Sequence, residues 1–304
     1  MKKIVSFFLM SLVVLVLISC GKKEITTNEQ ARKAFIAAYE KLNAKSGRFM
    51  DATFDFAATI DGMPMVFDGT MTIGYTVKPE FSAELDIVAN AEVSGMNMSF
   101  PLKGYYEIDE NELAFYINVL NTWTKTTMPY SQIDFEVMAA YNSVLLETID
   151  EVILKGKTEI NETPVYGLDV KFGDNTFSKM LEAAEKIMGD AEVQSMEELF
   201  QSAGISVKEF DLLFAGLYFP VYLRQSDLSL YGCSVDLELL LTQLIGNAAE
   251  IDGTEVPPDV LSELDMSGSM TMLYRDGEPA GVYTVPQEAR DAAVDMNVTE
   301  QMTF

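Results

Sequence analysis

Residues 49–60, with the sequence FMDATFDFAATI, establish the architecture expected of this chain. Apolar side chains occupy the even positions and most of the odd positions are polar. Strict alternation of this kind is typical of a β-strand with one buried and one wet face. Asp61-Gly62 follows directly and is a tight-turn signal, which predicts that the strand continues into a hairpin.

Three further segments, 63–77, 81–93 and 96–108, repeat the same alternation, and Ser94-Gly95 marks a second turn. One apolar and one polar face indicate an antiparallel meander with one side in water. Strands of twelve to fourteen residues would span about 40 Å at ~3.3 Å per residue. Long antiparallel strands coil, so we expect the sheet to wrap its apolar side into a concave surface.

Helices and shorter strands flank this meander. Residues 28–46 carry an apolar stripe (Ala31, Phe35, Ala38, Leu42), with Asn28 as the expected N-cap, and this helix is predicted to lie in the concave face. Helical segments are predicted around 131–155 and 175–217, the second containing a Ser206–Glu209 capping box. Shorter strands are expected at 113–119, 123–127, 158–172, 219–225, 228–241 and 266–274. The predicted fold class is α+β, a half-barrel wrapped around an N-terminal helix.

The first twenty residues are typical of an export signal. Met1-Lys2-Lys3 is a short basic segment, and it precedes an apolar run from Ile4 to Ile18 that is short for a membrane span. The run ends in Leu17-Ile18-Ser19-Cys20, which resembles a bacterial lipobox. That resemblance implies cleavage before Cys20 and its diacylation, and two acyl chains anchor stably. An ordinary cleaved signal peptide and a retained transmembrane helix are the alternatives.

These features give the expected organisation: a signal peptide at 1–19, a lipidated Cys20 and tether at 20–27, a domain at 28–290 and a tail at 291–304. We expect an extracytoplasmic protein, anchored to a bacterial membrane at the cell surface or periplasmic face and monomeric. Removing Lys2 and Lys3 with the signal takes the net charge from −26 to −28. Such an acidic protein is a poor partner for nucleic acid, which requires basic patches.

The composition excludes several kinds of chemistry. The chain has no histidine, which removes Ser-His-Asp triads, Cys-His dyads and histidine metal sites. It has no nucleophile elbow, P-loop or Cys-x-x-Cys. Cys233 is left without a disulfide partner once Cys20 is lipidated, and its alternating strand position predicts a buried thiol. Asp109–Glu112 and Asp252-Gly253 are expected to be turns rather than calcium ligands.

No spacing singles out a catalytic pair among the 47 carboxylates, so a solvated acidic surface is the better interpretation. We therefore expect no enzymatic activity, no cofactor and no metal.

Methionine is unusually frequent, with eighteen residues, and Met63-Pro-Met65 and Met96-Asn-Met98 fall at strand starts on the apolar face. A thioether Cu(I) site, ordinary core filling and an adaptable lining for a greasy ligand are three possible interpretations. The candidate lining of a lipid site is Phe54, Phe56, Met63, Met65, Phe67, Met71, Met96, Met98 and Phe100.

The order of lipobox, tether, helix, long meander, helical insertion and further strands resembles the LolA/LolB-like lipoprotein superfamily, in particular its uncharacterised Gram-positive-type members. Asn121-Thr-Trp123-Thr-Lys125 resembles their recurrent Trp-x-Lys strand, and Pro286–Ala289 closes the pattern. The resemblance implies an incomplete barrel around a helix with an apolar cavity for acyl chains. This chain is longer than the carrier proteins of that superfamily, and none of its arginines maps onto their buried-arginine motif.

Three functions follow as hypotheses. The first is a membrane-anchored lipoprotein that binds a lipid or another hydrophobic ligand on the concave sheet without catalysis. The second is a structural or accessory envelope protein with a solid core, which acts through contacts with proteins, cations or wall polymers. A third hypothesis is an enzyme, which would require two carboxylates that converge in a cleft and have raised pKa values.

Overall fold

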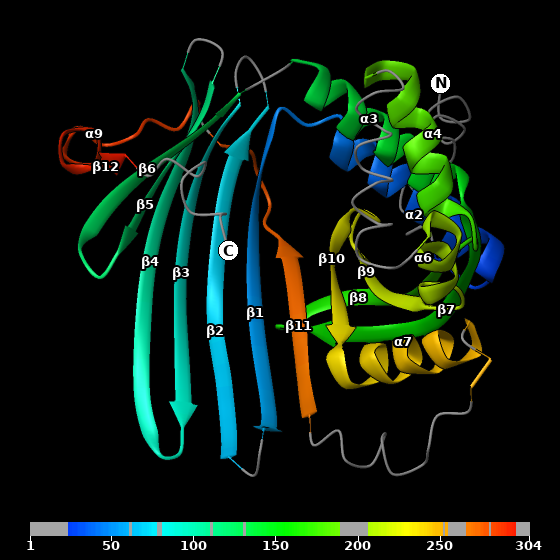
Figure 1. Cartoon of the computed structure of the whole chain (residues 1–304). Coiled ribbons are helices and arrows are strands. Elements are labelled where there is room, and N and C mark those ends of the chain that lie inside the picture. Colours follow the sequence, from blue (N-terminus) through cyan, green and yellow to red (C-terminus); the bar gives the residue numbers. More distant parts are fainter. Residues whose placement is uncertain are drawn as a thin grey trace, which may run out of the picture.

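In the part of the chain that the structure describes, twelve strands form one open sheet, which is the framework of the fold (Figure 1). The computed structural model describes residues 24–60, 63–77, 81–109, 112–129, 132–188, 206–251, 253–254, 266–279 and 281–295. Cys20 and the predicted signal peptide lie outside these residues. The strand order is β12-β6-β5-β4-β3-β2-β1-β11-β10-β9-β8-β7, and the sheet is antiparallel except where β12 meets β6.

The strands are β1 (Gly47–Ile60), β2 (Met63–Thr76), β3 (Ser82–Val93), β4 (Met96–Asp109), β5 (Glu112–Val119), β6 (Thr122–Pro129), β7 (Ile149–Ile160), β8 (Thr163–Phe172), β9 (Tyr218–Arg224), β10 (Leu230–Asp236), β11 (Met266–Tyr274) and β12 (Val294–Asp295). The helices are α2 (Asn28–Asn43), α3 (Gln132–Glu147), α4 (Thr176–Met188), α6 (Val207–Leu213), α7 (Leu237–Ile251) and α9 (Gln287–Ala292). The predicted α+β class and half-barrel architecture are confirmed, because the sheet curves and remains open at β7 and β12.

The meander β1–β4 has the expected strands, joined as antiparallel neighbours. Each strand pairs with the next along its length, with Phe56 opposite Phe67 and Ala89 opposite Phe100. Because opposite residues share a face, the register places the apolar positions of all four strands on one side, here called the apolar face. The other side is called the polar face.

Helix α2 packs elsewhere than predicted. It has the expected apolar stripe, and Ala31, Phe35, Ala38 and Leu42 are buried. However, these side chains form a core with residues of β7–β10, such as Val170. The apolar face continues across the sheet to β7–β10, and α2 covers it there and not over the meander (Figure 1).

The ends of α2 also differ from the prediction. Thr27 is the N-cap, since its hydroxyl accepts from the Gln30 amide, and the helix ends at Asn43. Asn28 instead accepts a hydrogen bond from the Leu154 amide. Ile25, in the predicted tether, is 5% exposed and belongs to the same core, so the packed domain begins before residue 28.

Two predicted segments are wrong in part. The helix predicted to reach residue 155 ends at Glu147, and β7 follows and pairs with β8 to form a hairpin. The strand predicted over 228–241 ends at Asp236, where the chain turns into α7. The Asp236 carboxylate accepts from the Leu239 amide and so stabilises the start of that helix.

The remaining helices form a cluster beside the sheet. Leu181 and Ala184 of α4 are buried against side chains of α3 and α6. The predicted capping box is confirmed, with Ser206 and Glu209 bonding reciprocally to each other's backbone amide. The buried carboxylate of Asp211 accepts from two backbone amides at the start of α4, and residues 189–205 lie outside the described part of the insertion.

The C-terminal segment crosses the polar face. The Tyr283 amide donates to Ser82 on β3 (2.7 Å), and Val285 and Ala289 pack against Tyr105 and Tyr116. Strand β12 then pairs with β6. The tail predicted from residue 291 therefore begins later, because α9 and β12 still belong to the domain.

Candidate functional site

The nine candidate lining residues lie on one continuous surface of β1–β4. Ala52, Phe54 and Phe56 stand opposite Met71, Gly69 and Phe67. The rings of Phe56 and Phe67 lie 6.3 Å apart. The register of β2–β3 and β3–β4 then brings Met96, Met98 and Phe100 to the same face. The structure thus gathers all nine candidates.

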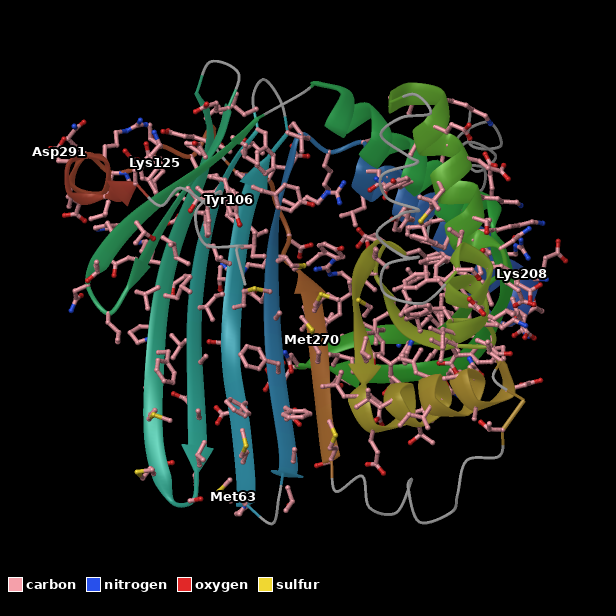
Figure 2. The ribbon with its side chains drawn as sticks, in the orientation of Figure 1. Met63, Tyr106, Lys125, Lys208, Met270 and Asp291 are labelled. Carbon is pink, nitrogen blue, oxygen red and sulfur yellow. The ribbon has the colours of Figure 1, made fainter. Side chains whose placement is uncertain are left out.

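This surface becomes more exposed toward one end. Phe54, Phe56, Met65, Phe67 and Met71 are half-buried. Met63, Met96, Met98 and Phe100 are 49%, 65%, 43% and 39% exposed. Met63 lies at the lower end of β2, away from the helices (Figure 2). Side chains this apolar and this exposed on adjacent strands form a patch of the kind that marks a binding surface.

Strand β11 extends the apolar face in a way that the sequence did not reveal. Met270 pairs with Phe54 and Met272 with Ala52, and β11 then pairs with β10 at Cys233. Met270 lies midway along β11 (Figure 2). Met266, Met270 and Met272 lie at even positions and indicated a strand with an apolar face. The sequence did not indicate that this strand pairs with β1, because the two strands are more than 200 residues apart.

Helix α7 borders this surface. It contacts β11 and β10, and the Leu237 side chain lies 3.3 Å from where a Cβ on Gly268 of β11 would stand. The helix is rich in leucine, yet none of its residues is fully buried, and Leu239 is 54% exposed. The helix thus adds exposed apolar side chains to the border of the open apolar sheet.

An arginine and three tyrosines lie on the apolar face at the end of the sheet where β1 begins and β2 and β11 end. Arg48 pairs with Tyr75 across β1 and β2, and its guanidinium carbon lies 5.7 Å from the centre of that ring. One guanidinium nitrogen donates to the Asn43 side chain (3.0 Å). Tyr39 of α2 and Tyr274 of β11 complete this arginine–tyrosine cluster, and Tyr39 donates to Asn142. Burial and the neighbouring tyrosines raise the pKa of Tyr274 to about 12, so its hydroxyl stays protonated.

Cys233 lies close to this cluster. The thiol is half-buried rather than fully buried, and burial raises its pKa. A thiol with a raised pKa is mostly protonated at neutral pH and is a weak nucleophile. The geometry supports the expected packing role.

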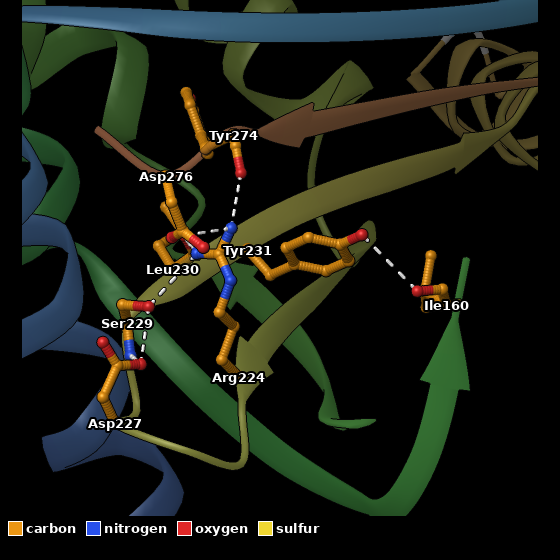
Figure 3. A network of polar contacts seen from close by, with 8 residues as sticks. All are labelled: Ile160, Arg224, Asp227, Ser229, Leu230, Tyr231, Tyr274 and Asp276. Carbon is orange, nitrogen blue, oxygen red and sulfur yellow. Dashed lines mark hydrogen bonds and ion pairs between the residues drawn. The ribbon is translucent and has the colours of Figure 1, made fainter. Parts of the chain in front are cut away.

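A hollow of about 490 Å³ opens on the polar face, around Arg224 and the end of β11. Arg224 is held there by the Tyr274 carbonyl (2.7 Å), the Asp276 carboxylate (3.3 Å) and the Tyr231 ring, which lies 4.6 Å away (Figure 3). These contacts fix the β9–β10 turn against β11. The side chains around the arginine are thus engaged with one another, which is typical of a structural network.

The predicted Trp-x-Lys segment lies on β6 and also faces the polar side. Trp123 packs 6.1 Å from the Tyr105 ring, and the Lys125 ammonium lies 5.4 Å from the ring of Tyr116. Their role in this fold is therefore to pack against the C-terminal segment.

The described residues contain neither a cluster of metal ligands nor a helix able to span a membrane. No group of three or more histidine, cysteine, aspartate or glutamate side chains is placed to hold a metal there. Within the same part of the chain, every helix is too short or too polar to cross a bilayer. Glu110, Asn111 and Asp252 of the two acidic turns lie outside that part.

Comparison with solved structures finds distant similarity to several proteins, among them one lipoprotein. The lipoprotein LppX of Mycobacterium tuberculosis is 11% identical, with 83% of this chain and 97% of that chain covered at a TM-score of 0.38. LprF of Mycobacterium bovis is 7% identical over 86% and 99% of the two chains (TM-score 0.35). A DUF1329 family protein of Desulfovibrio piger is 9% identical over 85% and 96% (TM-score 0.26).

No protein-family model and no curated protein matches the chain. All three TM-scores are below 0.5.

Proposed function

We propose that the protein is a membrane-anchored extracytoplasmic lipoprotein that binds a lipid or another hydrophobic ligand on the apolar face of β1–β4, without catalysis. The observation that carries the proposal is the contrast along this face. At β7–β10 helix α2 buries it, whereas at β2–β4 none of the described helices lies over it, and Met96 remains 65% exposed.

An acyl chain is a suitable occupant of this surface. Moving a sixteen-carbon chain from water to an apolar site gains about 0.8 kcal/mol per CH₂, or roughly 12 kcal/mol. An acyl chain that moves from a bilayer to the protein gains almost none of this free energy, because both environments are apolar. A lipid carrier therefore needs only a deformable apolar lining. Methionine supplies such a lining because its side chain is flexible and polarisable.

The proposed anchor at Cys20 would hold this surface near the membrane. Ile25 is already packed in the core, so four residues, 21–24, lie between the anchor and the first buried side chain. The five residue steps from Cys20 to Ile25 span at most ~18 Å. Lys157 pairs with Glu24 and holds the start of the described chain against β7. A domain this close to the bilayer can exchange lipid with it directly.

Two exposed side chains of the β3–β4 hairpin provide a matched test. Met98 lies on the apolar face and is 43% exposed, whereas Val88 lies on the polar face and is 40% exposed. Binding of a monoacylglycerol that carries an environment-sensitive fluorophore would be measured for Met98→Glu and Val88→Glu. We expect at least tenfold weaker binding for Met98→Glu and less than twofold change for Val88→Glu.

Equal binding by the two variants would contradict the proposed surface, and so would a wild-type protein that never binds. In the second case the structural or accessory role becomes the better hypothesis. The well-filled core beneath α2 is the observation that favours it. Native mass spectrometry of protein from its own host's envelope would then show a protein partner and no lipid.

A further inference from the structure

Arg48 differs from the other four arginines of the chain. Three of those pair with carboxylates, Arg224 with Asp276, Arg275 with Asp51 and Arg290 with Glu107. The fourth, Arg32, donates to two backbone carbonyls of β7. Among the described residues, no carboxylate forms an ion pair with Arg48, in a chain with 47 acidic residues.

Its position is also unusual. The β1 register places Arg48 on the apolar face, in line with Met50, Ala52 and Phe54, whereas Arg275 bonds to Asp51 on the polar face. Placing a guanidinium among apolar side chains costs free energy unless a counter-charge or hydrogen bonds compensate. Asn43 and the Tyr75 ring compensate only in part, because a guanidinium has five N–H donors.

The surroundings of Arg48 suit an oxyanion. The hydroxyls of Tyr75 and Tyr274 belong to the same arginine–tyrosine cluster, and a protonated tyrosine donates a hydrogen bond to an anion. Arginine binds phosphate and carboxylate through paired, charge-assisted hydrogen bonds. The net charge of −26 would otherwise repel any anion, so a local cation is required for one to bind.

We infer that the ligand is an anionic lipid, with its head-group phosphate at Arg48 and its acyl chain along the apolar face toward Met98. This rests on the proposed function and deepens it by naming the ligand class. Arg48 lies twelve residues from the far end of β1, which corresponds to ~40 Å. This exceeds the ~15 Å of one leaflet's hydrocarbon, so an acyl chain fits between the two ends.

The test compares three competitors of the fluorescent monoacylglycerol: lysophosphatidylglycerol, unlabelled monopalmitoylglycerol and inorganic phosphate. Lysophosphatidylglycerol should bind at least tenfold more tightly than the neutral lipid, a difference of about 1.4 kcal/mol. Arg48→Gln should abolish that preference and leave the neutral lipid within twofold of the wild type. Arg48→Lys should restore part of it. Lys179→Gln, which removes one exposed charge from α4, is the control and should change nothing.

The outcomes separate the two proposals. If both lipids bind equally and Arg48→Gln has no effect, the head-group site is wrong while the apolar surface stands. If neither lipid binds, the proposed function itself is wrong. If inorganic phosphate competes as strongly as lysophosphatidylglycerol, the site recognises the free anion and the assignment to a lipid is overturned. Circular dichroism of each variant establishes that loss of binding is not loss of fold.

Discussion

Phe54 lies over Gly69 on the neighbouring strand, and its ring would be 2.5 Å from a Cβ added at that glycine. The two residues are opposite each other in the register of β1 and β2. The ring thus fills the space that a side chain would take on the apolar face. Glycine at this position lets the Phe54 ring pack against the backbone of β2, which shapes the proposed lipid surface.

Gly69→Ala should therefore destabilise the fold. The added methyl group would meet both the Phe54 ring and the Val88 carbonyl oxygen of the next strand, and only the ring can move. Overpacking of this kind costs about 1–3 kcal/mol. Urea denaturation would measure the change, and an unfolding free energy equal to that of the wild type would contradict the predicted contact.

Gly246→Ala should have the opposite effect. Gly246 lies inside α7 and nothing stands within 4 Å of the position that its Cβ would occupy. Alanine in a helix interior is favoured over glycine by about 0.5–1 kcal/mol. An increase in the urea midpoint with an unchanged slope is the expected result. A decrease would show that α7 is not helical at this residue.

Asp51 and Arg275 should make stability depend on pH. The hydrogen bond from Arg275 holds the pKa of the Asp51 carboxylate below its ordinary value of 3.8. A lowered pKa means that the pair stabilises the fold above that value, and the contribution disappears as pH falls through the pKa of the folded state. Both side chains are more than a third exposed, so solvent screens the interaction.

Asp51→Asn is expected to lower the free energy of unfolding by less than about 1 kcal/mol at pH 7. The difference from the wild type should shrink steadily below pH 4. Lys179→Gln is a suitable control, because Lys179 is exposed on α4 and forms no ion pair with the described residues, so its effect should not change between pH 4 and pH 2. A difference for Asp51→Asn that persists at pH 2 would contradict the assignment.

Cys233 should react slowly with iodoacetamide in the folded protein. Burial raises the thiol pKa, so at pH 8 the folded protein holds less thiolate than the unfolded chain. The ratio of folded to unfolded rates should increase as pH rises toward 10, since the folded thiol then ionises too. Mass spectrometry of the labelled peptide measures both rates, and equal rates at pH 8 would contradict the burial.

The sequence predicted the meander well, because period-two alternation determines both the strand and its face. The apolar positions of β1 and β2, such as Phe56 and Phe67, could be paired by counting from the Asp61-Gly62 turn. Local turns therefore sufficed to predict the face shared by all nine candidate residues.

Features that depend on long-range packing could not be predicted. The apolar face extends over the whole sheet, and the sequence does not say that α2 covers β7–β10 rather than β1–β4. The leucines at 237, 239, 240 and 241 fit both a strand and a helix, since short apolar runs are ambiguous. The proposed role of Arg48 could not be predicted from the sequence, because it depends on the lack of an ion pair with any carboxylate among the described residues.

The pairing of β1 with β11 has a consequence for how the protein matures. β11 starts at Met266, so β1 acquires its second neighbour only after most of the chain is available. Until β11 pairs with it, the edge of β1 is long, partly apolar and free to pair with strands of other chains, which promotes aggregation. Such delayed closure also makes folding slow. For the proposed exported chain, which would cross the membrane from its N-terminus, the edge of β1 would remain unpaired until residues 266–274 had followed.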